Sequence, residues 1–255
     1  MTGQNRIGRV LGAAAAATFV DHAGPDGVTV RRGTRHHRKH RRPAEGSTWW
    51  APAARGWWIA VLFAVGSVLF SVGSVPGYTD AVGARGDSVT YFVGSLFFTT
   101  ASFLCYREAV DSSSTAARID WWAAAIQLVG TLYFNISTGL AMAAGLSASA
   151  AHAHVWRPDA IGSVCFLVSS VLAWYETCHG LLAWRPRVWA WWITLVNLAG
   201  SVAFGVSAVA GWIDPVTGQV RNLDRANTQT LIGALCFLVG SVLLLPERTE
   251  ETRVH

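Results

Sequence analysis

Three amide side chains fall within long apolar runs of the sequence. Gln127, Asn135 and Asn197 each interrupt a stretch of residues that are otherwise mostly apolar. A polar side chain in hydrocarbon is unfavourable unless it is paired or faces water. These amides predict either a polar cavity for a small solute or hydrogen bonds between neighbouring helices, and the second interpretation requires no function.

Two histidine patterns suggest metal chemistry, although neither is complete. Glu176 and His179 have the E-x-x-H spacing, which places both side chains on one helix face, and paired copies of that motif build di-metal sites in helical bundles. The sequence has one copy and no CxxC pair, so we expect no metal site and no cofactor. His152 and His154 fall in an expected outer loop, where they could bind a metal or sense pH.

Motifs of soluble enzymes do not occur in this sequence. It contains no G-x-x-x-x-G-K-[ST], no G-x-S-x-G, no H-E-x-x-H and no dinucleotide-binding glycine pattern. Most segments between the apolar runs are also too short for a catalytic domain. We therefore expect no catalytic residues and no enzymatic activity.

The composition favours a membrane protein. Of 255 residues, 52% are hydrophobic and 14% are charged, whereas soluble domains carry roughly 25% charged residues. The mean hydropathy is +0.34. This balance argues against a cytosolic enzyme, a disordered regulator and a secreted disulfide scaffold.

Six apolar runs are long enough to cross a bilayer as helices, which need about 20 residues. None has a charge in its central turns, and Arg107, Asp159 and Glu176 fall at run ends, where a charge is less costly. We therefore predict an all-α, polytopic membrane protein with six transmembrane helices. The runs cover about residues 56–76, 88–106, 121–145, 159–180, 189–212 and 227–245.

The first, third and fifth runs share the pattern WW-x7-G-[ST]-x2-F. The second, fourth and sixth share a Gly/Ser pattern, in which Tyr91–Ser95 is aligned with Phe166–Ser170 and Phe237–Ser241. The chain therefore reads as three parallel two-helix repeats, at about 57–107, 121–180 and 191–245. Small residues allow membrane helices to pack closely. The expected packing residues are Gly66, Ser67, Gly130, Thr131, Gly200, Ser201, Gly94, Ser95, Ser169, Ser170, Gly240 and Ser241.

The hairpins also resemble a known family. The phrases FVGSLFF (92–98), WRPDAIGSVCFLVSS (156–170) and GALCFLVGSVLLLPE (233–247) are similar to the YrhK-like family of small bacterial integral membrane proteins. The resemblance covers about residues 57–247. It implies a membrane location, and it supplies no reaction, cofactor or site residue.

Residues 1–48 read as a disordered basic cytoplasmic tail, followed by a transmembrane domain at 49–247 and a short cytoplasmic tail at 248–255. Ten of the 20 basic residues precede Trp57. Because positive residues stay on the cytoplasmic side, we expect both termini in the cytoplasm and the protein in the plasma membrane. A signal-peptide reading of residues 10–20 lacks a convincing cleavage site.

The basic run 31–42 (RRGTRHHRKHRR) is expected to set this orientation. It can also hold anionic lipid headgroups. It has no interleaved aromatic residues, which argues against nucleic acid as a partner. Besides the lipid bilayer, a homo-oligomer stays open as a partner.

The leading functional hypothesis is a non-enzymatic structural or partner-binding module. The alternative is a transporter or channel for a small solute or ion, which uses the polar stripe around Gln127, Asn135 and Asn197. A cavity lined by those amides would favour transport, and a dry, tightly packed bundle would argue against it.

Overall fold

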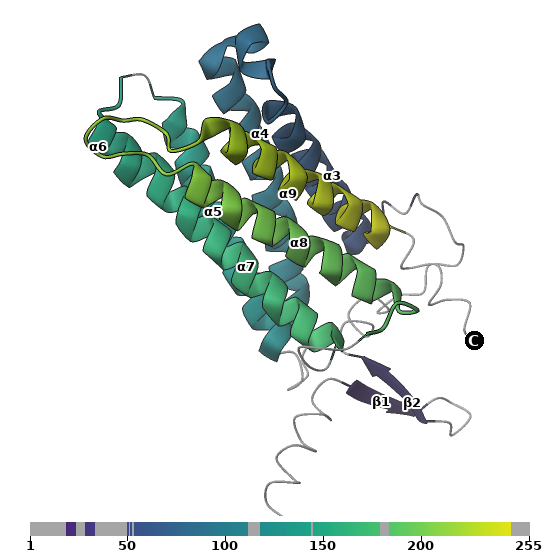
Figure 1. Cartoon of the computed structure of the whole chain (residues 1–255). Coiled ribbons are helices and arrows are strands. Elements are labelled where there is room, and N and C mark those ends of the chain that lie inside the picture. Colours follow the sequence, from purple (N-terminus) through teal and green to yellow (C-terminus); the bar gives the residue numbers. More distant parts are fainter. Residues whose placement is uncertain are drawn as a thin grey trace, which may run out of the picture.

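The computed structural model describes residues 19–23, 29–33, 50, 52, 54–111, 118–143, 145–178 and 184–245. Six long helices dominate this part of the chain (Figure 1). They are α3 (Arg55–Gly73), α4 (Tyr78–Asp111), α5 (Arg118–Ala141), α7 (Arg157–Cys178), α8 (Trp189–Ala210) and α9 (Leu223–Leu244).

Among the residues described above, five helical segments are long and apolar enough to cross a membrane, so the chain is a multi-pass helical membrane protein. They are α3, α4, α8, α9 and the continuous helical segment Ala148–Cys178. The prediction had six such segments. At 24 residues α5 has sufficient length, but Gln127 and Asn135 lower its hydropathy. Its contacts with α4 and α7 place it within the same bundle.

The six helices form a closed ring. Each packs against the helix before and after it in the chain, and α9 packs against α3 to complete the ring. Consecutive helices run in opposite directions (Figure 1). An exposed ion pair joins the start of α3 to the end of α4, with Arg55 Nη1 2.8 Å from Asp111 Oδ2. Because the ring is closed, one face of every helix lines its axis.

Two helices extend beyond their expected bounds. The helix expected at 88–106 is α4, which has 34 residues and bends at Gly83, where φ is 76°. The helix expected to begin at 159 begins eleven residues earlier, because α6 (Ala148–Ala151) continues through the π-helical turn η2 (His152–Trp156) into α7. Asp159 therefore lies three turns inside a continuous helix, and the expectation of a charge at the helix end was wrong.

The structure also corrects the expectation for the histidines. His152 and His154 belong to the π-helical turn and not to a loop. The Nδ1 atom of His152 lies 2.6 Å from the carbonyl oxygen of Ile213, and the centroid of its ring lies 6.1 Å from that of Trp212. These contacts tie α6 and η2 to the segment between α8 and α9, as expected for packing.

Two short strands precede the helices. β1 (Phe19–Ala23) and β2 (Thr29–Gly33) pair antiparallel, with Phe19 opposite Gly33. They fall within the segment predicted as a basic tail. The rest of that segment, most of the basic run 31–42 and residues 246–255 lie outside the described residues.

Candidate functional site

Each hairpin of the ring is held by a close crossing between two glycines. A Cβ atom on Gly66 would lie 3.0 Å from the carbonyl oxygen of Gly94. The same approach occurs between Gly130 and Gly162 at 3.1 Å, and between Gly200 and Gly233 at 3.1 Å. Only glycine permits these distances without movement of the neighbouring helix.

The crossings correct the alignment expected for α4. The Gly/Ser pattern aligned Gly94 with Ser169 and Gly240. By contact with the preceding helix, Gly94 instead occupies the place of Gly162 and Gly233, seven residues earlier on those helices. A shift of seven residues is two helical turns, so both alignments place small residues on the same face.

The expected packing residues lie where the helices meet. Ser67, Thr131 and Ser201 are fully buried, and all twelve positions are buried except Ser170, which is half-buried. Ser170 forms a hydrogen bond with Ser201 across α7 and α8 at 2.7 Å. Packing and hydrogen bonding therefore coincide on these faces.

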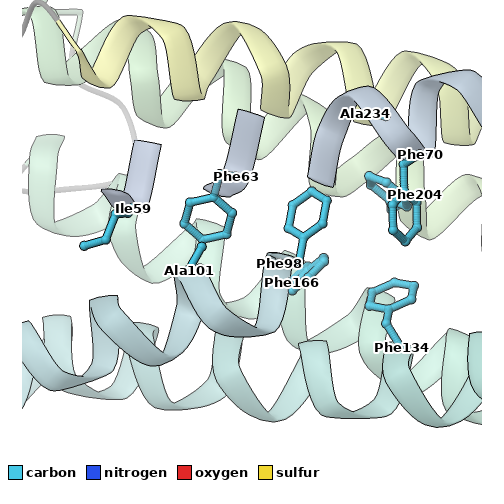
Figure 2. Close-up of a cluster of buried hydrophobic side chains, with 9 residues drawn as sticks. All are labelled: Ile59, Phe63, Phe70, Phe98, Ala101, Phe134, Phe166, Phe204 and Ala234. Carbon is cyan, nitrogen blue, oxygen red and sulfur yellow. The ribbon is translucent and has the colours of Figure 1, made fainter. Parts of the chain in front are cut away.

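A phenylalanine follows each crossing glycine by four residues. Five of these rings, Phe70, Phe98, Phe134, Phe166 and Phe204, gather at the centre of the bundle (Figure 2), and Phe237 packs against them. Three of these rings come from α3, α5 and α8, and their centroids lie 6.1–6.3 Å apart. Three come from α4, α7 and α9, and theirs lie 5.8–6.4 Å apart. We call these sets the first triangle, Phe70, Phe134 and Phe204, and the second triangle, Phe98, Phe166 and Phe237.

The triangles stack on each other at the middle of the bundle. Within each hairpin the two rings contact each other, with centroids 5.5 Å apart for Phe70 and Phe98 and 5.0 Å for Phe134 and Phe166. Only about 10 Å³ of free space is enclosed among these rings, roughly the minimum that holds one water molecule. The centre of the ring is therefore closed and apolar.

A cavity of about 160 Å³, lined by both polar and apolar side chains, lies on one side of the triangles. We call it the Gln127 cavity. Its floor is the second triangle, and Gln127 and Asn197 line it close to that floor. The carboxylates of Glu108 and Asp120 line it as well. Hydroxyls complete its polar lining, from Ser169, Ser170, Thr194, Ser201 and Ser241.

A second cavity of about 190 Å³ lies on the other side. We call it the Asp159 cavity. Its floor is the first triangle, and its walls carry the Asp159 carboxylate and the Asn227 amide. Hydroxyls again complete the polar lining, from Ser88, Tyr91, Ser137, Thr138, Ser207 and Thr230.

The amides expected to act together are thus separated. Gln127 and Asn197 line the same cavity. They occupy equivalent positions on α5 and α8, each three residues before the crossing glycine of its helix. Asn135 lies elsewhere: its Nδ2 donates to Thr99 Oγ1 at 2.9 Å, and its buried Oδ1 has no hydrogen-bond partner within the described structure. For Asn135 the interhelical hydrogen bond is the observed arrangement.

The metal candidates do not form a site in the described part of the chain, where no three His, Cys, Asp or Glu side chains come together. Glu176 is buried near the end of α7, and His179 lies outside the described residues. The described bundle thus has two partly polar compartments with an apolar barrier between them.

Sequence reasoning overlooked the Asp159 cavity and half of the phenylalanine core. The signal was present, because all six helices carry G-x3-F, and only those of α3, α5 and α8 stood out through their Trp-Trp pairs. Tyr91, Asp159 and Thr230 all lie three residues before a crossing glycine and line one cavity. With the correct alignment of α4, the sequence would have placed them together.

Comparison with known proteins adds no assignment. No family model, no curated protein and no solved structure matches this chain. The resemblance to the YrhK-like family therefore stays a prediction, and the cavities themselves carry the functional argument.

Proposed function

We propose that the helix ring provides a gated passage for a small polar solute across the membrane. The observation that carries this proposal is the pair of polar cavities, which lie on the bundle axis at opposite sides of the phenylalanine triangles. Close packing, which uses apolar, small and hydrogen-bonded side chains between membrane helices, leaves few voids larger than a water molecule. Polar cavities inside membrane helices typically line solute pathways.

The triangles act as the gate. Hydrophobic constrictions close a pathway by excluding water, so a solute must displace the rings in order to pass. The Gly–Gly crossings hold the helix backbones while the rings pack against the glycines of the partner helix. For example, a Cβ on Gly94 would lie 2.8 Å from the Phe70 ring. Rotation of a few rings opens the axis without separating the helices.

Three copies of one helical hairpin build this passage in our proposal. Trp58 donates its Nε1 hydrogen to the Pro52 carbonyl, and Trp192 donates in the same way to Pro186, both at 2.9 Å. The matching glycine crossings and the two phenylalanine triangles support the same threefold plan.

The proposed location is the plasma membrane, with both termini in the cytoplasm. Arginine placement supports this orientation. The Gln127 cavity then faces the cytoplasm, because it lies at the end of the bundle where α3, α5 and α8 begin. The Asp159 cavity faces outward.

Solute flux into proteoliposomes tests the passage. We expect the double variant Phe134→Ala/Phe204→Ala to admit glycerol and methylammonium faster than the unmodified protein, because it removes two rings of the first triangle. The matched control is Phe103→Ala on α4, whose side chain is 46% exposed and lies away from the axis. Light scattering after rapid mixing measures the flux.

The proposal fails if the folded double variant is no more permeable than protein-free vesicles. If the double variant does not fold, Phe237→Ala is the substitute, because this ring is only half-buried. Equal permeability for all variants would favour the structural or partner-binding role instead.

A further inference from the structure

We infer that the Asp159 cavity is a binding site for a small primary alkylammonium cation, a choice of solute that rests on the proposed passage. Three features of the cavity lead to this solute class. They are the direction of its hydroxyl hydrogens, the single carboxylate in its wall and the aromatic rings of its floor.

The hydroxyls of this cavity present oxygen lone pairs, because their hydrogens are already donated elsewhere. Ser137 donates to the Val155 carbonyl at 2.8 Å, and Thr138 donates to the Phe134 carbonyl at 2.7 Å. Ser88 likewise donates to a carbonyl of its own helix at 2.9 Å. A hydroxyl has one hydrogen and two lone pairs, so these groups can only accept from a ligand.

Two further hydroxyls of the lining, those of Thr230 and Tyr91, also have their hydrogens donated to neighbouring hydroxyls. Ser207 donates to the Ala226 carbonyl at 2.9 Å, so the 2.7 Å contact between Ser207 and Thr230 must use the hydrogen of Thr230. Ser74 donates to the Phe70 carbonyl at 2.8 Å, so its 2.8 Å contact with Tyr91 uses the phenol hydrogen. The Asn227 amide remains as a potential donor in the lining, and acceptors dominate it.

Asp159 adds a carboxyl group to this acceptor-rich wall, and the ionised form of this group carries a negative charge. Within the described structure, the lining of the cavity contains no Lys, Arg or His. A charged side chain inside a membrane bundle is costly, and it is retained where it pairs with a partner or a solute. A cation that donates several hydrogen bonds matches both the charge and the lone pairs.

The floor of the cavity selects an organic cation over a hydrated metal ion. Phe70, Phe134 and Phe204 form this floor, and the Tyr91 ring packs edge-on against Phe70 at 5.3 Å. Aromatic rings attract ammonium groups and also cover short alkyl chains. A cavity of about 190 Å³ accommodates a small amine, whereas a hard metal ion prefers oxygen ligands on all sides.

Calorimetric titration of the full chain in lipid nanodiscs with n-propylammonium chloride tests the site. We expect saturable binding that Asp159→Asn weakens by about tenfold or more, as loss of a hydrogen bond to a charged group does. The matched control is Asp224→Asn, an exposed carboxylate in the first turn of α9. It should leave the affinity unchanged.

A second variant keeps the test informative if Asp159→Asn fails to fold. Thr230→Val replaces the hydroxyl, which is a hydrogen-bond acceptor, with a methyl group and keeps nearly the same side-chain shape. It should also weaken binding. Unchanged affinity in both variants would overturn the inference. So would equally tight binding of tetramethylammonium, which has no N–H group, or displacement of propylammonium by an equal concentration of K⁺.

The proposed passage and this site can fail separately. Propylammonium binding without uptake into proteoliposomes overturns the passage and leaves the site. Glycerol flux through the gate variant without any propylammonium binding overturns the site and leaves the passage.

Discussion

Gly130 and Gly162 face each other so closely that neither position has room for a methyl group. A Cβ on Gly130 would lie 3.1 Å from the Gly162 carbonyl oxygen, and a Cβ on Gly162 would lie 3.0 Å from that of Gly130. The approach is reciprocal, so each glycine sets the helix separation for the other. The spacing of α5 and α7, and therefore the width of both cavities, depends on this pair.

The first prediction is that Gly130→Ala destabilises the protein. Its Cβ would also lie 2.8 Å from the Cβ of Cys165, and this is a contact that helix movement alone can relieve. Overpacking of this kind costs about 1–3 kcal/mol. We expect a lower midpoint of thermal unfolding in detergent.

Gly205→Ala is the matched control for this prediction. Gly205 also lies within a long helix, α8, and a Cβ there would have no heavy atom within 4 Å. Its midpoint should stay equal or rise slightly, since alanine favours helix. Equal losses in both variants would show that close approach is not what matters at the crossing.

The second prediction is that Gln127 and Asn135 have different roles in solute uptake. Gln127→Leu removes a polar group from the wall of the Gln127 cavity, so solute uptake should fall while thermal stability changes little. Asn135→Leu should leave uptake unchanged. Its hydrogen bond to Thr99 is lost, but so is a buried acceptor without a partner, and the net stability change should stay within about 1 kcal/mol.

Uptake by proteoliposomes and thermal unfolding of the same preparations measure both effects. If Asn135→Leu abolished uptake and Gln127→Leu did not, the assignment of the solute path would be wrong. Asn197→Leu provides a further comparison, because Asn197 lines the same cavity as Gln127.

The third prediction concerns orientation. Deletion of residues 1–48 removes most of the ten early basic residues. The remaining Arg bias is small, so we expect a mixture of two orientations in the membrane. Reporter fusions at the C-terminus, active on one or the other side, measure the fractions. Insertion in a single orientation, as for the full chain, would remove this role from the tail.

The fourth prediction is a pH dependence in the segment between α8 and α9. The Asp214 carboxylate accepts hydrogen bonds from the backbone N–H groups of Thr217 and Val216, both at 2.8 Å. These bonds lower the pKa of Asp214 below its ordinary value of 3.8. The turn is therefore stabilised fully above pH 3.8, and this contribution is lost as the pH falls through the lower, folded-state pKa.

NMR titration of the Val216 and Thr217 amide resonances measures this transition in the full chain. The midpoint should lie below 3.8, and Asp214→Asn should abolish the titration. A midpoint at or above 3.8 would contradict the hydrogen-bonding pattern.

Much of the helical architecture could be predicted from the sequence. The Trp-Trp pairs and apolar runs identified α3, α5 and α8 well, because the Gly and Phe positions recur at one spacing. The alignment of α4 failed because α7 and α9 each carry two sets of small residues, two turns apart on the same helix face, and Gly94 was aligned with the wrong set. Local patterns cannot distinguish these sets, and only contact with Gly66 resolves them.

Asp159 shows a different limit. Its distance from the helix end depends on the π-helical turn before it, which carries a His-rich sequence that resembles a loop. Its cavity depends on α4 and α9 as well as α7. The second relation is not local in sequence, and the first depends on a short segment whose composition resembles a loop, so hydropathy alone placed the carboxylate at a helix end.

The closed ring has a consequence for the direction of travel. Every helix is antiparallel to both of its neighbours, and every helix carries its crossing glycine and its phenylalanine at the same spacing. The helix frame therefore looks nearly the same from either side of the membrane. The layers next to the aromatic floors differ: Phe63, Gln127 and Asn197 on one side, Tyr91, Asp159 and Thr230 on the other. In the proposed passage, a solute therefore meets two amides in the layer on one side of the barrier, and a carboxyl with two hydroxyls in the layer on the other side. The helix frame is nearly the same in both directions, and these six positions make the two directions of travel chemically different.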